Sequence, residues 1–260
     1  MDRARQSTES NPPAAPQPAG ATPPGPVELL PAEVHLWRVG VSGSAASYAT
    51  AAGALSEDER LRASRFRFEA DRSRFVAAHA ALRGILASYL GAAPASLAFG
   101  AGTHGKPFLH SPGHGRSLRF SLSHSGALAL VAVSLEREVG VDVERVRPLS
   151  DLDGFVARYL SPREREAIAR SPSTDRLRAF FETWTLKEAY LKACGDGLAR
   201  ELVAFDVTVG DGPSRLLAVR DRPGDETRWA LRQVEVGDDF VAALAVEGRD
   251  WQLRRWDWTA

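Results

Sequence analysis

The chain has one cysteine, almost no lysine and no long apolar run. The single cysteine, Cys194, excludes an internal disulfide and favours a reducing compartment, so we predict a cytoplasmic protein. No apolar segment approaches the roughly 20 residues that a membrane-spanning helix needs. No basic start followed by an apolar segment, as in a secretory leader, is visible either. We therefore expect no membrane association.

The chain also lacks a net charge, with 33 acidic and 33 basic residues. This balance argues against an overall basic field for nucleic acid. Only three of the basic residues are lysine, namely Lys106, Lys187 and Lys192. A lysine ammonium is a compact charge, whereas arginine is a planar fork, so lysine is favoured where the fork does not fit. Chance placement of the three lysines is the alternative.

Composition divides the 260 residues into four parts. Residues 1–27 are rich in proline and alanine and predict a disordered extension. Residues 28–144 and 145–250 are expected to form an N-terminal and a C-terminal lobe, followed by a tail over 251–260. With 44% hydrophobic residues, the chain can supply a core for each lobe.

The two lobes share a helical pattern. Ser56 with Glu59, and Ser161 with Glu164, form capping-box sequences about a hundred residues apart. Each is followed by a long predicted helix, over residues 71–90 and 175–193, which ends at a glycine. Predicted strands follow each helix pair, over 120–123, 128–134, 139–144, 202–209, 228–236 and 240–246, and another precedes the first pair over 33–39. The sequence therefore predicts an α+β fold of two similar lobes in a pseudo-twofold arrangement, each a small antiparallel sheet packed by a long helix.

A charged residue interrupts the apolar stripe of the second long helix. The stripe contains Leu177, Phe181, Trp184 and Leu191. Glu188 falls on it, with Lys192 one turn further on, while Gly84 holds the equivalent place in the first lobe. A carboxylate there is costly unless it is paired or binds a metal ion. An ordinary surface pair of Glu188 with Lys192 is the alternative.

Two short segments carry further polar groups. In 139–144, valines alternate with Asp142 and Glu144, whose carboxylates could flank one cation; a solvated acidic face is the alternative. In 120–126, hydroxyls, His124 and a glycine cluster at a strand end and offer phosphate donors. The neighbouring Ser123 and His124 do not indicate a hydrolase, because no nucleophile-elbow motif surrounds the serine. A plain turn is the alternative.

Together these segments resemble the larger, two-lobed (Sfp-type) 4′-phosphopantetheinyl transferases over roughly residues 33–246. Four motifs carry the resemblance, in order: Gly105-Lys106-Pro107, residues 120–125, Gly140-Val141-Asp142-Val143-Glu144, and residues 184–192 followed by Gly195-Asp196-Gly197-Leu198. Each motif is weak alone, but four in order at family-like spacing are specific. All three lysines fall inside these motifs.

The resemblance implies a role for particular residues. Asp142, Glu144 and Glu188 match the acids that bind magnesium, which manganese can replace. Coenzyme A is the implied co-substrate, and its phosphates and neighbouring groups would meet Arg62, Arg74, Gly105, Lys106, Pro107, Ser123, His124 and Lys192. The match is loosest for Arg62 and Arg74, at the 3′-phosphate. Two departures are Ser121, where asparagine is common, and Glu59, near a position that is commonly basic.

The implied reaction moves the phosphopantetheine arm of coenzyme A to a serine of an apo acyl or peptidyl carrier protein and releases adenosine 3′,5′-bisphosphate. Asp142, Glu188 and Lys192 are the expected catalytic residues: Lys192 offsets charge on the departing phosphate, and Glu188 receives the serine proton, preferably through a water molecule. We expect a monomer in the synthesis of polyketides, nonribosomal peptides or fatty acids. Exposed arginines that could meet an acidic carrier are Arg158, Arg163 and Arg165.

Two alternatives stay open at this point. A magnesium-dependent hydrolase could use the same acids and lysine to cleave the pyrophosphate of coenzyme A with water. A degenerate protein could hold coenzyme A without chemistry.

Overall fold

The computed structural model describes residues 20–21, 27–110, 117–210 and 212–259. Most of the predicted disordered extension, residues 1–27, lies outside these described residues. Within it, β1 (Gly20–Ala21) pairs in parallel with a strand near the C-terminus. None of the helices in the described ranges is long and apolar enough to cross a membrane.

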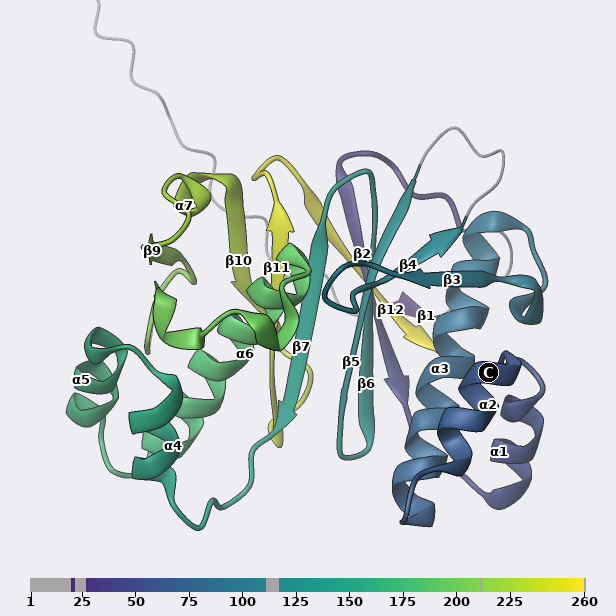
Figure 1. The fold of residues 1–260 in the computed structure, drawn as a ribbon, viewed down its shortest axis with the longest axis horizontal. Helices are drawn as coiled ribbons and strands as arrows, with labels where there is room; N and C mark the ends of the chain where they lie inside the picture. Colours follow the sequence, from purple (N-terminus) through teal and green to yellow (C-terminus); the bar gives the residue numbers. More distant parts are fainter. Residues whose placement is uncertain (1–19, 22–26, 111–116, 211, 260) are drawn as a thin grey trace, which may run out of the picture.

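Two lobes stand side by side, each with a sheet and one long helix (Figure 1). The first lobe contains, in chain order, β2 (Glu33–Gly40), α1 (Ala45–Ala52), α2 (Glu57–Ser64), α3 (Glu69–Leu90), β3 (Ala98–Ala101), β4 (Pro107–His110), β5 (Leu118–Ser125) and β6 (Leu128–Leu135). The second contains β7 (Val139–Arg145), α4 (Leu152–Tyr159), α5 (Pro162–Arg170), α6 (Arg176–Cys194), β8 (Phe205–Val207), β9 (Leu216–Val219), α7 (Asp225–Arg228), β10 (Trp229–Gln233) and β11 (Phe240–Glu247). The last strand, β12 (Gln252–Trp258), returns to the first lobe. The α+β class is confirmed.

The repeated helical pattern is present in the structure. Both capping boxes are formed, by Ser56 with Glu59 and by Ser161 with Glu164. The long helices α3 and α6 both end at a glycine in the left-handed conformation, Gly91 and Gly195, which a residue with a side chain rarely adopts. The predicted capping boxes and terminal glycines are therefore present, although α3 begins at Glu69, two residues before its predicted start.

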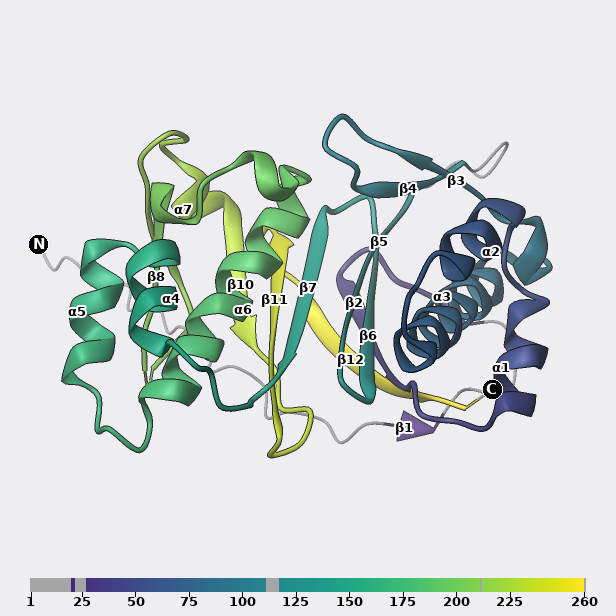
Figure 2. The same ribbon diagram turned by 60° about the horizontal axis from the view of Figure 1, so that its bottom comes forward.

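The main sheets pack as two inner layers between the two long helices. Their strand orders are β1-β12-β2-β6-β5 and β10-β11-β7. One face of the first sheet packs against α3, around Trp37 and Val131. Its other face shares a core with the second sheet, in which Val141 and Val143 of β7 are buried. The second sheet is covered on its outer face by α6 (Figure 2).

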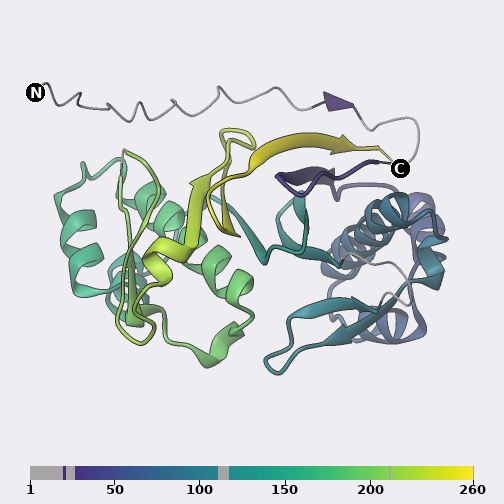
Figure 3. The same ribbon diagram turned by 90° about the horizontal axis from the view of Figure 1, so that it is seen from above.

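Two strands differ from the expected division into lobes. Residues 139–144, placed by sequence in the first lobe, form β7 and pair with β11 in the second sheet. Residues 251–260, expected to be a tail, include β12, which runs parallel to β2 and makes the first sheet mixed rather than antiparallel (Figure 3). The indole of Trp256 stacks on Trp37, with ring centroids 5.8 Å apart. Two adjacent arginines interrupt the apolar alternation of β12, so its pattern does not indicate a strand.

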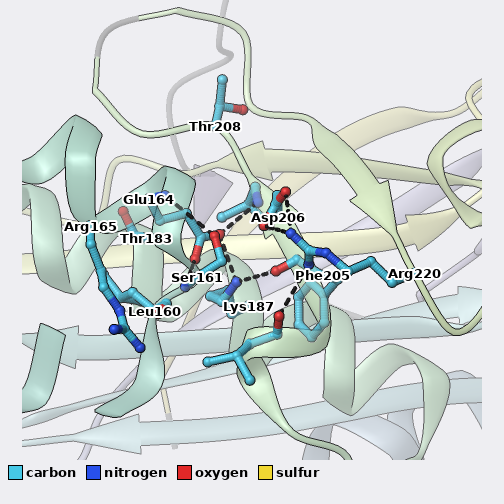
Figure 4. A network of polar contacts seen from close by, with 12 residues as sticks. Leu160, Ser161, Glu164, Arg165, Thr183, Lys187, Phe205, Asp206, Thr208 and Arg220 are labelled. Atoms are coloured by element: carbon cyan, nitrogen blue, oxygen red, sulfur yellow. Dashed lines mark hydrogen bonds and ion pairs between the residues drawn. The ribbon is translucent and has the colours of Figure 1, made fainter. Parts of the chain in front are cut away.

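A buried ion pair joins three elements of the second lobe (Figure 4). Lys187 Nζ lies 2.6 Å from Glu164 Oε1, and both side chains are fully buried. The ammonium also donates a hydrogen bond to Phe205 O at 2.6 Å. Glu164 in turn accepts from the backbone N–H groups of Ser161 and Val207. The pair therefore holds α5, α6 and β8 together.

The buried charge in α6 is thus Lys187, whereas Glu188 is only half-buried. The predicted stripe of α6 divides between two cores: Phe181 and Trp184 pack with α4 and α5, whereas Leu191 packs with the second sheet. Buried positions consequently lie on more than one stripe of this helix.

We predict that Lys187→Ala lowers the free energy of unfolding by about 3–5 kcal/mol, because it leaves the Glu164 carboxylate buried without its cation. Urea denaturation measures this loss. The double variant Lys187→Met with Glu164→Gln should lose less than the two single variants together, since neither partner is then charged. A loss below about 1 kcal/mol for Lys187→Ala, as for an exposed pair, would contradict this prediction.

Candidate active site

Close contact between β7 and α6 forms the floor of the candidate site. A Cβ atom on Gly140 would lie 2.0 Å from Ala189 O and 2.4 Å from Ala193 N. Only glycine permits this approach of strand to helix. As a result, Asp142, two residues along β7, faces the last turns of α6.

Asp142 and Lys192 form the central contact of the site. Lys192 Nζ lies 2.7 Å from Asp142 Oδ1, and the Asp142 side chain is 6% exposed. Ser123 of β5 donates to the same Oδ1 at 2.8 Å and accepts from Lys192 Nζ at 2.9 Å. Side chains from β5, β7 and α6 therefore meet at one point between the lobes.

The other two acids lie close enough to Asp142 to affect one another. Burial raises the pKa of Glu144, and the charge of Asp142 raises it further. Burial also raises the pKa of Glu188, and the charges of Asp142 and Glu144 add to this rise. Ser125 donates to Glu144 Oε2 at 2.8 Å and partly offsets the effect. The three carboxylates thus share one region of negative potential.

The site contains oxygens suited to a hard cation. Asp142 Oδ2 is buried and has no hydrogen-bond partner within the described part of the chain. A buried carboxylate oxygen without a partner is costly, and a cation would satisfy it. Within the described ranges, no group of three His, Cys, Asp or Glu side chains is arranged so that it could hold a metal ion. The donor chemistry fits magnesium, and Asp142, Glu144 and Glu188 as its ligands stay a prediction.

Histidines and basic residues line the side of the site nearest the first lobe. His124, at the end of β5, has its pKa lowered, first by loss of solvent around the ring and then by the charges of His79, Lys192 and Arg74. Two of these residues, His79 and Arg74, come from α3, and Lys192 comes from α6. Each of the three neighbours already contacts an acid: Arg74 pairs with Asp71, His79 with Glu59 and Lys192 with Asp142. This part of the site includes the predicted contacts Ser123, His124, Arg74 and Lys192.

The Gly105-Lys106-Pro107 loop lies at the C-terminal end of α6. Lys106 Nζ donates to Glu138 Oε2 at 2.6 Å and to Ala193 O at 2.7 Å. Its ammonium therefore ties the loop to the last turn of the helix. Lys106 and Pro107 of the loop, together with Phe120 and the residues that follow α6, line a cavity of about 360 Å³. A role of Gly105, Lys106 and Pro107 in ligand binding stays a prediction.

The acidic departure at Glu59 is neutralised within the first lobe. Its carboxylate lies 2.6 Å from Arg83 Nε and 3.2 Å from His79 Nδ1, and it also caps Ser56. Burial would raise its pKa, but these hydrogen bonds outweigh burial and lower it to about 2. Arg62 lies over the Phe75 ring at 5.3 Å. Glu59 therefore serves the packing of α2 on α3.

Sequence reasoning missed Gly140 and Ser125 as site residues. Gly140 sets the distance between β7 and α6, and Ser125 holds Glu144. The alternation of Ser121, Ser123 and Ser125 was the available signal, since it has the same period of two as the acids of β7.

Gly140→Ala should push α6 away from β7, because the new methyl group meets helix backbone that cannot rotate aside. We expect a loss of stability of about 1–3 kcal/mol, the usual cost of overpacking. Thermal or urea unfolding measures it. The matched control is Gly40→Ala in β2, where an added Cβ meets nothing within 4 Å. Equal stability losses in the two variants would contradict the close-contact argument.

The ionised Glu59 should stabilise the protein above about pH 4.5, its ordinary pKa, and this contribution should disappear as the pH falls through about 2. We expect Glu59→Gln to cost about 1–3 kcal/mol at neutral pH, because the buried Arg83 loses its partner. Urea denaturation of both proteins across this pH range tests the sign. A gap in stability that stays constant or widens on acidification would contradict it.

Two family models match consecutive parts of the chain. The model described as "4'-phosphopantetheinyl transferase, N-terminal" matches residues 42–136. The model described as "4'-phosphopantetheinyl transferase superfamily" matches residues 138–245. The change from one model to the other falls just before β7, where the chain passes from the first sheet to the second.

Relatives extend over most of the chain. The 4′-phosphopantetheinyl transferase HetI of Nostoc sp. is 40% identical over 228 residues, which covers 88% of this chain and 93% of that protein. The phosphopantetheinyl transferase of Thraustochytrium sp. is 32% identical over 84% of this chain and 80% of its own length. The 4′-phosphopantetheinyl transferase of Bacillus subtilis is 28% identical over 76% of this chain and 84% of that protein. This chain belongs to the 4′-phosphopantetheinyl transferase superfamily, among its larger, two-lobed members.

Proposed function

We propose that this protein transfers the 4′-phosphopantetheine arm of coenzyme A to a serine of an apo carrier protein and releases adenosine 3′,5′-bisphosphate. Family membership supports the reaction class. The observation that carries the assignment to this site is the contact of Asp142 with Lys192 and Ser123, which joins both lobes at one point. Acids on one side of that point and cations on the other suit a pyrophosphate.

Magnesium, or manganese in its place, is the ion we propose for Asp142, Glu144 and Glu188. When bound, it would neutralise charge on the pyrophosphate and polarise the phosphorus that is attacked. The unpartnered Asp142 Oδ2 and the raised pKa values of the two glutamates support a cation at these residues.

Two residues of the chain act directly in the reaction: Lys192 stabilises the leaving group, and Glu188 accepts a proton. Lys192 holds the departing phosphate oxygen and offsets the charge that builds there. Glu188, directly or through a water molecule, receives the proton of the carrier serine. A carboxylate bound to a divalent cation is a weak base, so the route through a water molecule is preferred. The serine oxygen bonds to the β-phosphorus as the bond to the bridging oxygen breaks.

The nucleotide half of coenzyme A is oriented by the basic side of the site. We assign its phosphates to His124, Arg74 and Lys192, since Arg74 and Lys192 both lie close enough to His124 for their charges to lower its pKa. Arg62 is a further 3′-phosphate contact in the proposal. Lys106 and Pro107 line the cavity beside α6, and with Gly105 they complete the proposed contacts of the same ligand.

The partner we propose is an acyl or peptidyl carrier of polyketide, peptide or fatty-acid synthesis. Arg158 and Arg163 are exposed on α4 and α5, where they can meet an acidic carrier. Arg165 is half-buried and donates to Leu160 O, so it is less free to do so. The proposal includes a cytoplasmic monomer that binds neither nucleic acid nor a membrane.

Asp142→Asn should lower transfer by at least about 100-fold, because the amide keeps the shape but loses the charge that faces Lys192 and the cation. Mass spectrometry of an apo carrier incubated with coenzyme A and magnesium measures transfer directly. Asp250→Asn is the matched control, since Asp250 is exposed and pairs with Arg137 away from the site. Full transfer by Asp142→Asn would contradict the proposal.

The same measurement separates the alternatives. Transfer adds the arm to the carrier, whereas hydrolysis cleaves coenzyme A and leaves the carrier mass unchanged. A binding protein without chemistry leaves both molecules intact. Either result from the wild-type protein, across several carriers, would overturn the proposed function.

A further inference from the structure

Strands β5 and β7 lie side by side as the facing edges of the two sheets. Their contact is made by side chains of β5 and backbone of β7. Three serines of β5, at alternate positions, accept hydrogen bonds from the backbone N–H groups of β7: Ser121 from Val141, Ser123 from Val143 and Ser125 from Arg145. We call Ser121, Ser123 and Ser125 the serine ladder.

Each hydroxyl takes the place that a strand carbonyl would have in a continuous sheet. The N–H to Oγ distances are 3.1, 3.4 and 3.1 Å. A backbone N–H at a buried strand edge needs an acceptor, and the serine ladder supplies three in a row. The two lobes are therefore joined along the site by hydroxyl groups.

Accepting from the backbone leaves each hydroxyl proton to be donated elsewhere. Ser123 donates to Asp142 and Ser125 donates to Glu144, both at 2.8 Å. The remaining serine, Ser121, lies opposite Gly140, which has no side chain to accept its proton. Thus the first lobe orients two acids that the second lobe carries. Ser121 shares the backbone contact but has no acid.

We propose that Ser125 is a positioning residue that fixes the Glu144 carboxylate for the divalent cation. This inference rests on the proposed function, because it needs a cation at Asp142, Glu144 and Glu188. Ser125 is the informative rung, since Ser123 also contacts Lys192 and is expected to meet phosphate. The hydroxyl of Ser125 holds one carboxylate oxygen, so Glu144 Oε2 stays directed along the ladder and its other oxygen is left for the ion.

The test is manganese affinity of the whole protein, measured by electron paramagnetic resonance or calorimetry with and without coenzyme A. We expect Ser125→Ala to weaken manganese binding by about 10-fold or more, as loss of a hydrogen bond to a metal ligand commonly does. Ser121→Ala, the matched control, removes the same backbone contact and should change affinity by less than about twofold. Ser125→Thr keeps the hydroxyl and should bind manganese like the wild type.

A double-variant cycle separates positioning from simple joining of the lobes. If Ser125 acts through Glu144, Ser125→Ala has no further effect on affinity in a Glu144→Gln background. Where Ser125→Ala does not fold, Ser125→Cys keeps the volume with a weak donor and replaces it.

Equal manganese affinity of Ser125→Ala and wild type would overturn the inference and leave the proposed function standing. An equal loss in Ser121→Ala and Ser125→Ala would overturn it as well, since the ladder would then act on the fold alone. Failure of the wild-type protein to bind manganese, even with coenzyme A, would remove the proposed metal site and the inference with it.

Discussion

The site depends on one constraint, the backbone-to-backbone contact of α6 with β7 at Gly140. A side chain at this position would occupy the space of Ala189 O and Ala193 N. Because the strand lies directly on the helix, Asp142 of β7 reaches Lys192 of α6 at 2.7 Å. Glu188, one turn earlier in α6, is then close enough for the charge of Asp142 to raise its pKa. The chemistry of the site follows from the missing Cβ.

The two lobes share a helical pattern, but only one carries the acids. The place in α3 that corresponds to Glu188 is Gly84, and a Cβ there would lie 2.6 Å from the ring of Trp258. β12 brings this indole from the end of the chain to cover α3. An apolar ring therefore fills, in the first lobe, the space that a carboxylate occupies in the second.

Local signals predicted the elements well, and long-range pairing limited the rest. The capping boxes and the glycines that end α3 and α6 are formed because each is decided within a few residues. The valine alternation of β7 likewise placed its acids on the face opposite the shared core. By contrast, the pairing of β7 with β11 and of β12 with β2 depends on residues far away in the chain. The local sequence of β7 or β12 does not indicate which sheet the strand joins.

The candidate site was predictable in its charged residues and not in what holds them. Asp142, Lys192 and Ser123 stand together as the motifs implied. The burial of Lys187 was not predictable, because its partner Glu164 already serves a capping box and shows no second role in sequence. The role of Ser125 was not predicted for a similar reason. A serine on a strand indicates no particular contact until the neighbouring strand is known.

The acids of the site are not balanced by the cations of the described chain. Asp142, Glu144 and Glu188 bring three negative charges, and Lys192 is the one cation in hydrogen-bond contact with Asp142 within the described ranges. Arg147 approaches Glu144 only at 3.5 Å from an exposed position. Burial is the main cause of the raised pKa values of both glutamates, and the charges of the neighbouring carboxylates add to the rise. A divalent ion would cancel the two charges that Lys192 leaves. The serine ladder offers hydrogen bonds but no charge, so it can direct the acids without competing with that ion.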